Sequence, residues 1–187
     1  MSSINIAGDT SGSIAIAAPA VAGSNTLTLP ASTGTVLTSV SPASDLPSSI
    51  KGPTFRASKN STQSISTSTW TKIQFNVEDW DTNSNYDNAT NYRFTPTVAG
   101  YYQVDMQIEF NNVSGNYLCS IYKNGSAYIT SSFYAGSTGG STPSAHALIY
   151  MNGSTDYIEG YGYTTVTSQS VYNGTATYFN AALVRSA

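Results

Sequence analysis

The chain has 187 residues and a formal net charge of -3, and only 9 % of its residues are charged. Nucleic-acid binding needs clustered Lys and Arg, so this composition argues against a nucleic-acid partner. No apolar run is long enough to span a bilayer and no signal peptide follows Met1, so we expect no membrane insertion. The single cysteine, Cys119, excludes an intrachain disulfide framework.

The first fifty residues contain no aromatic side chain, and Asp9 and Asp45 are their only charges. Short alternating runs at 13–17, 25–30 and 35–38 predict small strands separated by Gly and Pro. Such a segment buries too little side-chain area to offset the entropy of ordering it. We therefore expect these strands to be stable only when they pair with other chains; the alternative is a flexible linker.

Residues 39–53 are rich in serine and contain three prolines, which is typical of a semi-extended connector. We therefore divide the chain into an N-terminal attachment or stalk segment (1–38), a linker (39–53) and a head domain (54–187).

The clearest element of the head is residues 100–110, whose side chains alternate between apolar and polar. This pattern predicts a long β-strand with one buried face. The row expected in the core is Tyr102, Val104, Met106, Ile108 and Phe110.

The rest of the head also has an all-β pattern. Strands are predicted at 54–57, 70–77, 92–95, 117–123, 127–134, 145–151, 157–163 and 175–185, and a polar loop is predicted at 79–91. Asn-Gly pairs at 124–125, 152–153 and 173–174 are strong turn signals. Many short strands with turns between them indicate an antiparallel sandwich or jelly roll.

The last predicted strand is apolar on both faces. Phe179, Ala181 and Leu183 form one row; the other contains Tyr178, Ala182 and Val184. One face of a sandwich strand meets the core, so the second must meet another element or subunit. Tyr178, Ala182 and Val184 are therefore candidates for a contact with another element or another subunit.

Two stretches resemble known families. The run 12–36 resembles a segment of bacteriophage tail-fibre and other virion-fibre proteins, where it precedes a receptor-binding or trimerising head. The resemblance implies a virion location and contacts with other virion proteins through the N-terminal segment.

Six residues of the head follow one another in the order of a known signature: Phe75, Asp81, Tyr86, Phe94, Gly100 and Tyr102. Through these residues the head is similar to the complement globular-head signature of the tumour-necrosis-factor-like superfamily. The head departs from the signature by one extra residue between Tyr86 and Phe94, and by Val104 and Met106 where aromatic residues are usual. The resemblance implies a ten-stranded antiparallel jelly roll that forms a homotrimer, with the closing strand in the sheet nearest the trimer axis. It thereby makes Tyr178, Ala182 and Val184 the candidate trimer-interface residues.

The sequence offers little for catalysis or cofactors. A nucleophilic device would have to use the only histidine, His146, which we interpret as a packed or interface residue. We expect no enzyme activity and no cofactor. Asp79, Asp81 and Asp87 carry the hard oxygen atoms that calcium prefers, but their spacing fits no calcium loop, so we favour a turn-forming role.

Tyrosines among small polar residues form good recognition surfaces, and their rings also suit sugars. Tyr161, Tyr163 and Tyr172, with Asp81 of the acidic loop, are the candidate receptor-binding residues; the alternative is that these tyrosines close the sandwich or the trimer interface.

These observations favour a trimeric phage fibre whose head binds a glycan or protein of the host surface. The alternatives are a capsid-decorating fibre without an essential receptor and a secreted ligand of the complement or tumour-necrosis-factor type. The missing signal peptide and collagen repeat count against the secreted ligand. A glycan-degrading tailspike is disfavoured, because it would need paired carboxylates in a cleft. The acidic residues here crowd one loop or lie on the polar face of one strand.

Overall fold

The computed structural model describes residues 3–7, 13–17, 52–111, 114–136 and 141–187. The chain divides into two units, residues 1–41 and 42–187. In the first unit, β1 (Ser3–Ala7) and β2 (Ser13–Ala17) form an antiparallel pair. The strand predicted at 13–17 is confirmed, but its partner is a strand of the same chain that we did not predict. The predicted strands at 25–30 and 35–38 lie outside the described residues.

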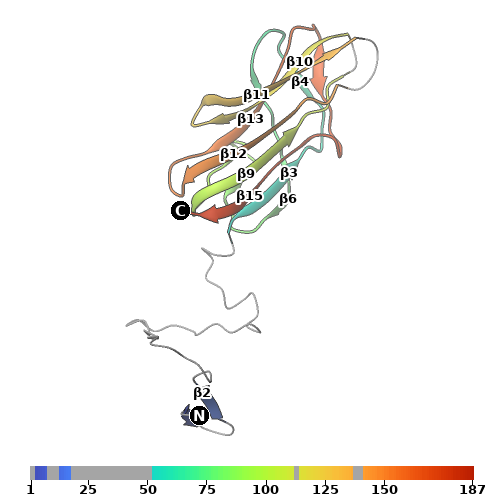
Figure 1. Ribbon diagram of the computed structural model, residues 1–187. Coiled ribbons are helices and arrows are strands. Elements are labelled where there is room, and N and C mark those ends of the chain that lie inside the picture. Colours follow the sequence, from blue (N-terminus) through green and yellow to red (C-terminus); the bar gives the residue numbers. More distant parts are fainter. Residues whose placement is uncertain (1–2, 8–12, 18–51, 112–113, 137–140) are drawn as a thin grey trace. The chain divides into compact units, whose positions relative to one another are not determined.

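The second unit contains 13 strands, all in antiparallel sheets, which confirms the predicted all-β sandwich (Figure 1). One five-stranded sheet, here called the β9 sheet, has the order β12-β9-β15-β3-β6. The other, the β10 sheet, has the order β11-β10-β13-β8-β7, with β5 also pairing β13, and β4 pairs β14 separately. The strands are β3 (Thr54–Ser58), β4 (Gln63–Ile65), β5 (Thr71–Lys72), β6 (Val77–Asp81), β7 (Tyr86–Asp87), β8 (Arg93–Phe94), β9 (Ala99–Gln107), β10 (Gly115–Lys123), β11 (Ser126–Ala135), β12 (Ser144–Asn152), β13 (Ile158–Thr164), β14 (Gln169–Val171) and β15 (Tyr178–Ser186).

The core lies between the two sheets, and β9 supplies its centre. The predicted alternation is confirmed, because the whole apolar row from Tyr102 to Phe110 is fully buried and the polar row is not. The regular strand ends at Gln107, and the amides of Ile108 and Phe110 then bond to the carbonyls of Pro143 and Ser141. Cys119 on β10 is buried in this core.

The opposing strand β13 contributes glycines to the core. A Cβ atom on Gly160 would lie 2.5 Å from Met106 Sδ and 2.8 Å from a ring atom of Phe75. A Cβ on Gly162 would be 3.1 Å from Ile73. Because these inward positions carry no side chain, the large residues of the β9 sheet can fill the space.

The strand predicted at 70–77 is wrong in its middle. The chain pairs with β13 at Thr71 and Lys72, and the Ile73 amide also donates to the Gly160 carbonyl; the chain then crosses to the other sheet and pairs with β3 from Val77. At the crossing, side chains replace the ladder: Gln63 bonds the carbonyl of Lys72 and the amide of Gln74. Ile73 and Phe75 are nevertheless buried in the core, so the predicted alternation of buried and exposed side chains is kept.

Lys59 holds the same crossing from inside the protein. Its Nζ donates to Gln63 Oε1 at 3.1 Å and to the Gln74 carbonyl at 2.9 Å. The residue is 6 % exposed, and this burial lowers the pKa of Lys59 to about 8. Both partners are neutral, so burial penalises the charged amine without a carboxylate to offset it.

Lys59→Met should therefore remove a pH dependence of stability. Between pH 8 and the usual pKa of 10.5, the folded chain has lost this proton and the unfolded chain keeps it. Stability of the natural chain then rises with pH, by at most about 1.4 kcal/mol per pH unit for one proton. Urea unfolding of the natural chain and of Lys59→Met at about pH 7.5 and about pH 9.5 measures this change in the free energy of unfolding. The other titrating groups are the same in both proteins, so the difference between them reports Lys59. Equal changes in the two chains would contradict the prediction.

The polar loop predicted at 79–91 is also partly wrong. Strand β6 extends through Asp81, and β7 forms at Tyr86–Asp87. β6 is the edge of its sheet and exposes Glu78, Asp79 and Trp80. Edge strands are commonly polar on both faces. This strand therefore lacks the alternation of apolar and polar residues from which a strand is predicted.

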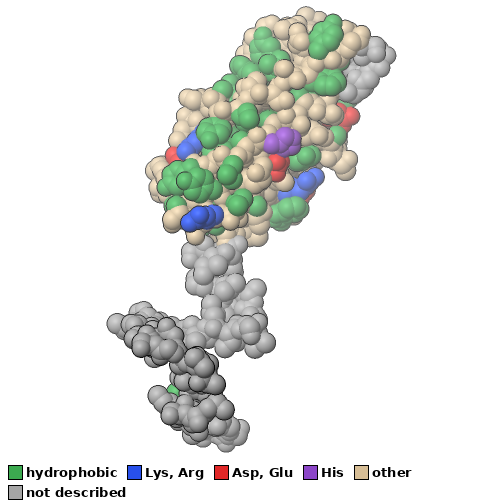
Figure 2. Space-filling model, in the orientation of Figure 1, with side chains coloured by type: hydrophobic (Ala, Val, Ile, Leu, Met, Phe, Trp, Pro, Cys, Tyr) green, Lys and Arg blue, Asp and Glu red, His purple; other side chains and the backbone are tan. Residues whose placement is uncertain are grey.

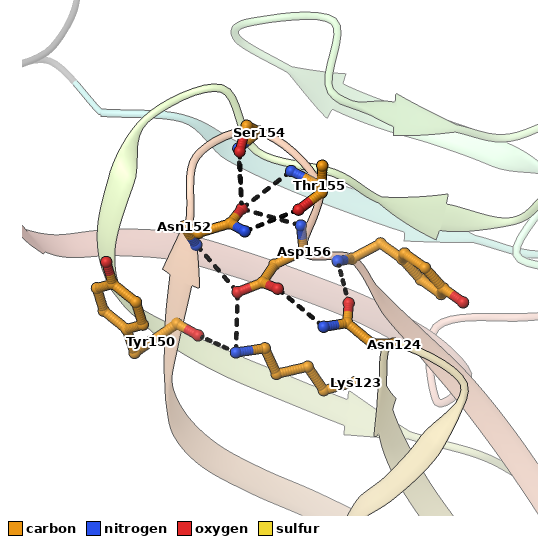
Figure 3. Close-up of polar contacts among 8 residues, drawn as sticks. Lys123, Asn124, Tyr150, Asn152, Ser154, Thr155 and Asp156 are labelled. Atoms are coloured by element: carbon orange, nitrogen blue, oxygen red, sulfur yellow. Dashed lines mark hydrogen bonds and ion pairs between the residues drawn. The ribbon is translucent and has the colours of Figure 1, made fainter.

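Two predicted turns are joined by hydrogen bonds at the end of the head where the chain enters. Asn124 and Gly125 both have positive φ (52° and 78°), as an Asn-Gly hairpin turn requires. The Asn124 side chain accepts from the Tyr157 amide and donates to Asp156. Figure 3 shows how this contact connects the β10–β11 turn to the β12–β13 turn.

Asp156 is the centre of this connection. It also accepts from the Asn152 amide at 3.0 Å and from Lys123 Nζ at 2.9 Å (Figure 3). Burial alone would raise the pKa of Asp156, but the bonds from Asn124, Lys123 and Asn152 outweigh it, so its pKa is lowered. The entry end of the head is thus fixed by side chains as well as by its strands.

Candidate binding surfaces

Tyr161 and Tyr163 lie together on the outer face of the β10 sheet. They alternate along β13 with Gly160 and Gly162, which face the core. Tyr161 stacks on Tyr122 of β10, with 4.0 Å between ring centroids. Trp70 packs against Tyr163 at 5.2 Å and Tyr122 at 6.0 Å. We call Trp70, Tyr122, Tyr161 and Tyr163 the aromatic cluster; all four are half-buried.

Charged groups lie along one side of the aromatic cluster. Lys72, opposite Tyr161 in the ladder, forms an ion pair with Glu159 and donates to the Asn91 carbonyl. Tyr161 donates its hydroxyl to Glu159 at 3.4 Å. The pKa of Tyr161 is raised to about 12, mainly by burial and next by the nearby Glu159 carboxylate. The tyrosine is therefore a neutral hydrogen-bonding group at physiological pH.

Tyr172 and Asp81 do not join this cluster. Tyr172 bonds through its amide to the Glu109 carbonyl and through its hydroxyl to Asn111, beyond the end of β9. Asp81 is opposite Phe55 near the start of β3, at the end where the chain enters the head. The four candidate receptor-binding residues thus occupy three places, and only Tyr161 and Tyr163 are neighbours.

The acidic residues proposed as calcium ligands bind the chain itself. Asp79 pairs with Arg56 at 3.0 Å, and Asp81 accepts from the amides of Asn83 and Tyr86. Asp87 caps a turn, and amide bonds from Thr90 and Ala89 contribute to lowering its pKa to about 2. In the part of the chain that the structure describes, no three His, Cys, Asp or Glu residues are grouped to hold a metal.

The outer face of the β9 sheet is a second candidate surface. Of the predicted interface residues, Ala182 and Val184 are exposed, Val184 to 63 %, and Tyr178 is half-buried beneath Arg56. Val184 is the extra residue of a bulge in the β15–β9 ladder. Sequence analysis missed three further exposed residues of this face, Tyr101, Leu148 and Tyr150. Figure 2 shows apolar side chains spread across it.

His146 lies within this face rather than in the core. It is exposed, and its Nδ1 is 2.9 Å from Asp105 Oδ1 on β9 (Figure 2). His146 is therefore not packed in the core of one chain, and its role as an interface residue stays a prediction. A few residues away on β15, Asn180 Oδ1 is buried and accepts no hydrogen bond from the described part of the chain.

The third candidate surface is the free edge of the β10 sheet. Ile129 and Phe133 of β11 are opposite Ile121 and Tyr117, which are fully buried. Cross-strand partners share a face, so Ile129 and Phe133 also point to the core side. Yet they are 36 % and 44 % exposed. Along the described residues, the two sheets therefore leave apolar core-side groups uncovered at this edge.

Comparisons with known proteins identify the fold. No protein-family model matches the sequence, and no curated protein does. Among solved structures, the globular domain of zebrafish complement 1qA superposes with a TM-score of 0.56, covering 72 % of this chain and 99 % of that domain at 15 % identity. The Eiger TNF of S. frugiperda superposes with a TM-score of 0.57, covering 73 % and 93 % at 10 % identity.

The head is a complement- and TNF-like jelly roll. This confirms the predicted fold class. The vertex protein P5 of phage PRD1 superposes as well, with a TM-score of 0.51 over 72 % of this chain and 96 % of that protein, at 18 % identity. At these identities the similarity concerns the fold. None of the described residues forms a helix that could cross a membrane.

Proposed function

We propose that this protein is a trimeric fibre of a phage particle, attached through residues 1–38, whose head (54–187) binds the host surface without catalysis. The observation that carries the trimer is the uncovered free edge. Ile129 and Phe133 face the core side and remain exposed in one chain. Covering them with a second copy would complete the core in the usual way for apolar surface.

A closed trimer needs two different patches, because each subunit contacts the next through unlike surfaces. The free edge of β11 is one patch, and the outer face of the β9 sheet is the other. That face carries exposed Tyr101, Leu148 and Val184, together with the Asp105–His146 pair and Arg185.

The virion role is supported by the fibre-like run at 12–36 and by the shared fold of a phage vertex protein. That neighbour favours one rival, a decoration fibre on the capsid without an essential receptor. The secreted-ligand alternative shares the fold of the complement and TNF domains but has no support from the N-terminal run.

Two measurements on the full-length protein test this proposal. Multi-angle light scattering at micromolar concentration should show a trimer; a stable monomer would contradict the assembly. The purified protein should also compete with particles for adsorption to host cells, and particles lacking it should adsorb poorly. Normal adsorption by such particles would favour the decoration fibre instead.

A further inference from the structure

We propose that the aromatic cluster is a binding site for a neutral carbohydrate. This inference rests on the proposed function, because it names the class of host-surface ligand that the head takes. The cluster lies on the outer face of the β10 sheet, whereas the proposed trimer uses the β9 face and the β11 edge. It therefore stays accessible when the three subunits assemble.

The strand register builds a compact platform from three neighbouring strands. Tyr161 stands at its centre, opposite Ser120 of β10 and Lys72 of β5. Ser120 is fully buried although it faces outward, and its hydroxyl donates to the Ile129 carbonyl and accepts from Thr130 of β11. The rings of the cluster contact one another over the sheet, with polar groups at their border.

The ring arrangement suits a sugar. A pyranose has an apolar face whose C–H bonds carry slight positive charge, and the face of an aromatic ring is slightly negative. Tyr122 and Tyr161 hold each other in place through their stacking, which leaves little entropy to lose on binding. Small-ligand sites commonly combine such aromatic walls with a few fixed polar groups.

The polar border suits the hydroxyl groups of a sugar. The Lys72 amine and the Tyr161 hydroxyl lie beside the rings, and the Glu159 carboxylate, itself only 3 % exposed, holds both of them in place. They are already ordered by contacts with one another. A sugar could therefore bind them without first fixing long side chains.

The charges around the platform favour a neutral ligand. Two cations, Lys72 and Arg93, are matched by two anions, Glu159 and Asp87: Lys72 pairs with Glu159, and Arg93 is opposite both Glu159 and Asp87 in its ladders. The Arg93 guanidinium also stacks on a tyrosine ring at 4.5 Å. A balanced border gives no net attraction to an acidic polymer, so we assign the site to uncharged hexose or N-acetylhexosamine units.

Tryptophan fluorescence of the full-length protein tests the site directly. The chain has two tryptophans, so in a Trp80→Phe variant Trp70 is the only reporter. The probes are maltoheptaose, cellopentaose, mannopentaose and chitopentaose, with polygalacturonate and polysialic acid as acidic counterparts. At least one neutral probe should shift the Trp70 emission in a saturable way. No shift with any of the four at millimolar concentration would overturn the inference, as would binding of the acidic polymers alone.

Matched variants then locate the binding. On an array of the same sugars, Trp70→Ala and Tyr163→Ala should each bind about tenfold more weakly. Trp80→Ala removes an exposed tryptophan from the opposite sheet and should bind normally. Equal binding by Trp70→Ala and Trp80→Ala would overturn the inference. The fluorescence experiment leaves the cluster intact, so it decides even if Trp70→Ala fails to fold.

The outcome separates this inference from the proposed function. A trimer that competes with particle adsorption but binds no neutral sugar would leave the fibre role standing and remove the carbohydrate site. Adsorption that survives periodate oxidation of the host cells but is lost after protease treatment would point to a protein receptor. That result would also overturn the inference.

Discussion

Met106→Asp should prevent the head from folding. Met106 is fully buried on β9, opposite Phe179 of β15 and Ala145 of β12. Its sulfur occupies the space beside Gly160. Removing a buried methionine side chain costs about 2–5 kcal/mol, and burying an unpaired carboxyl group adds several more. The sum approaches the whole stability of a small domain, about 5–15 kcal/mol.

The control for this variant is the next residue on the same strand. Gln107 points to the other face, and its side chain donates one hydrogen bond to the Ala176 carbonyl at 3.1 Å. Gln107→Asp should cost at most about 1.5 kcal/mol, the value of one such bond. Circular dichroism and urea unfolding of the full chain would show a folded Gln107→Asp and an unfolded Met106→Asp. Two equally folded variants would mean that the register of β9 is wrong.

The core strand could be located from sequence because a single two-residue period describes which of its side chains are buried. Every second residue from Tyr102 to Phe110 is apolar, and each of these side chains is buried. The same rule failed at 70–77, where the alternation is equally regular. There the buried side chains keep their order, but the backbone groups of Lys72 and Gln74 bond to the side chains of Gln63 and Lys59. Local periodicity reports which side chains are buried, and it does not report which groups satisfy the backbone.

The candidate surfaces show a second limit. Tyr161 and Tyr163 could be chosen from sequence, since each stands next to a glycine in a strand. Trp70 and Tyr122 could not, because their contacts depend on β13 pairing with both β5 and β10. Likewise, Ile129 and Phe133 have the pattern of ordinary core residues. Only the sheet order, which makes β11 an edge, shows that they are left exposed.

Phe133→Asp should convert the proposed trimer to a monomer. Phe133 is 44 % exposed on the core side of the β11 edge, so a charge there would meet the apolar face of the next subunit. Multi-angle light scattering at micromolar concentration would show the loss of the trimer, and circular dichroism should be unchanged. Ser132→Asp is the control, because Ser132 is opposite Leu118 on the outer face of the same strand. A trimeric Phe133→Asp would exclude this edge from the interface.

The two-patch geometry makes a sharper prediction when a second variant is added. Leu148 is exposed on the outer face of the β9 sheet, so Leu148→Asp should also be monomeric. Mixing the two variants restores one good contact, since the intact edge of Leu148→Asp can meet the intact face of Phe133→Asp. The remaining edge and face are both damaged, and the ring cannot close. The mixture should therefore form heterodimers and no trimers. Trimers in the mixture, or no association at all, would contradict an interface between the β11 edge of one subunit and the β9 face of the next.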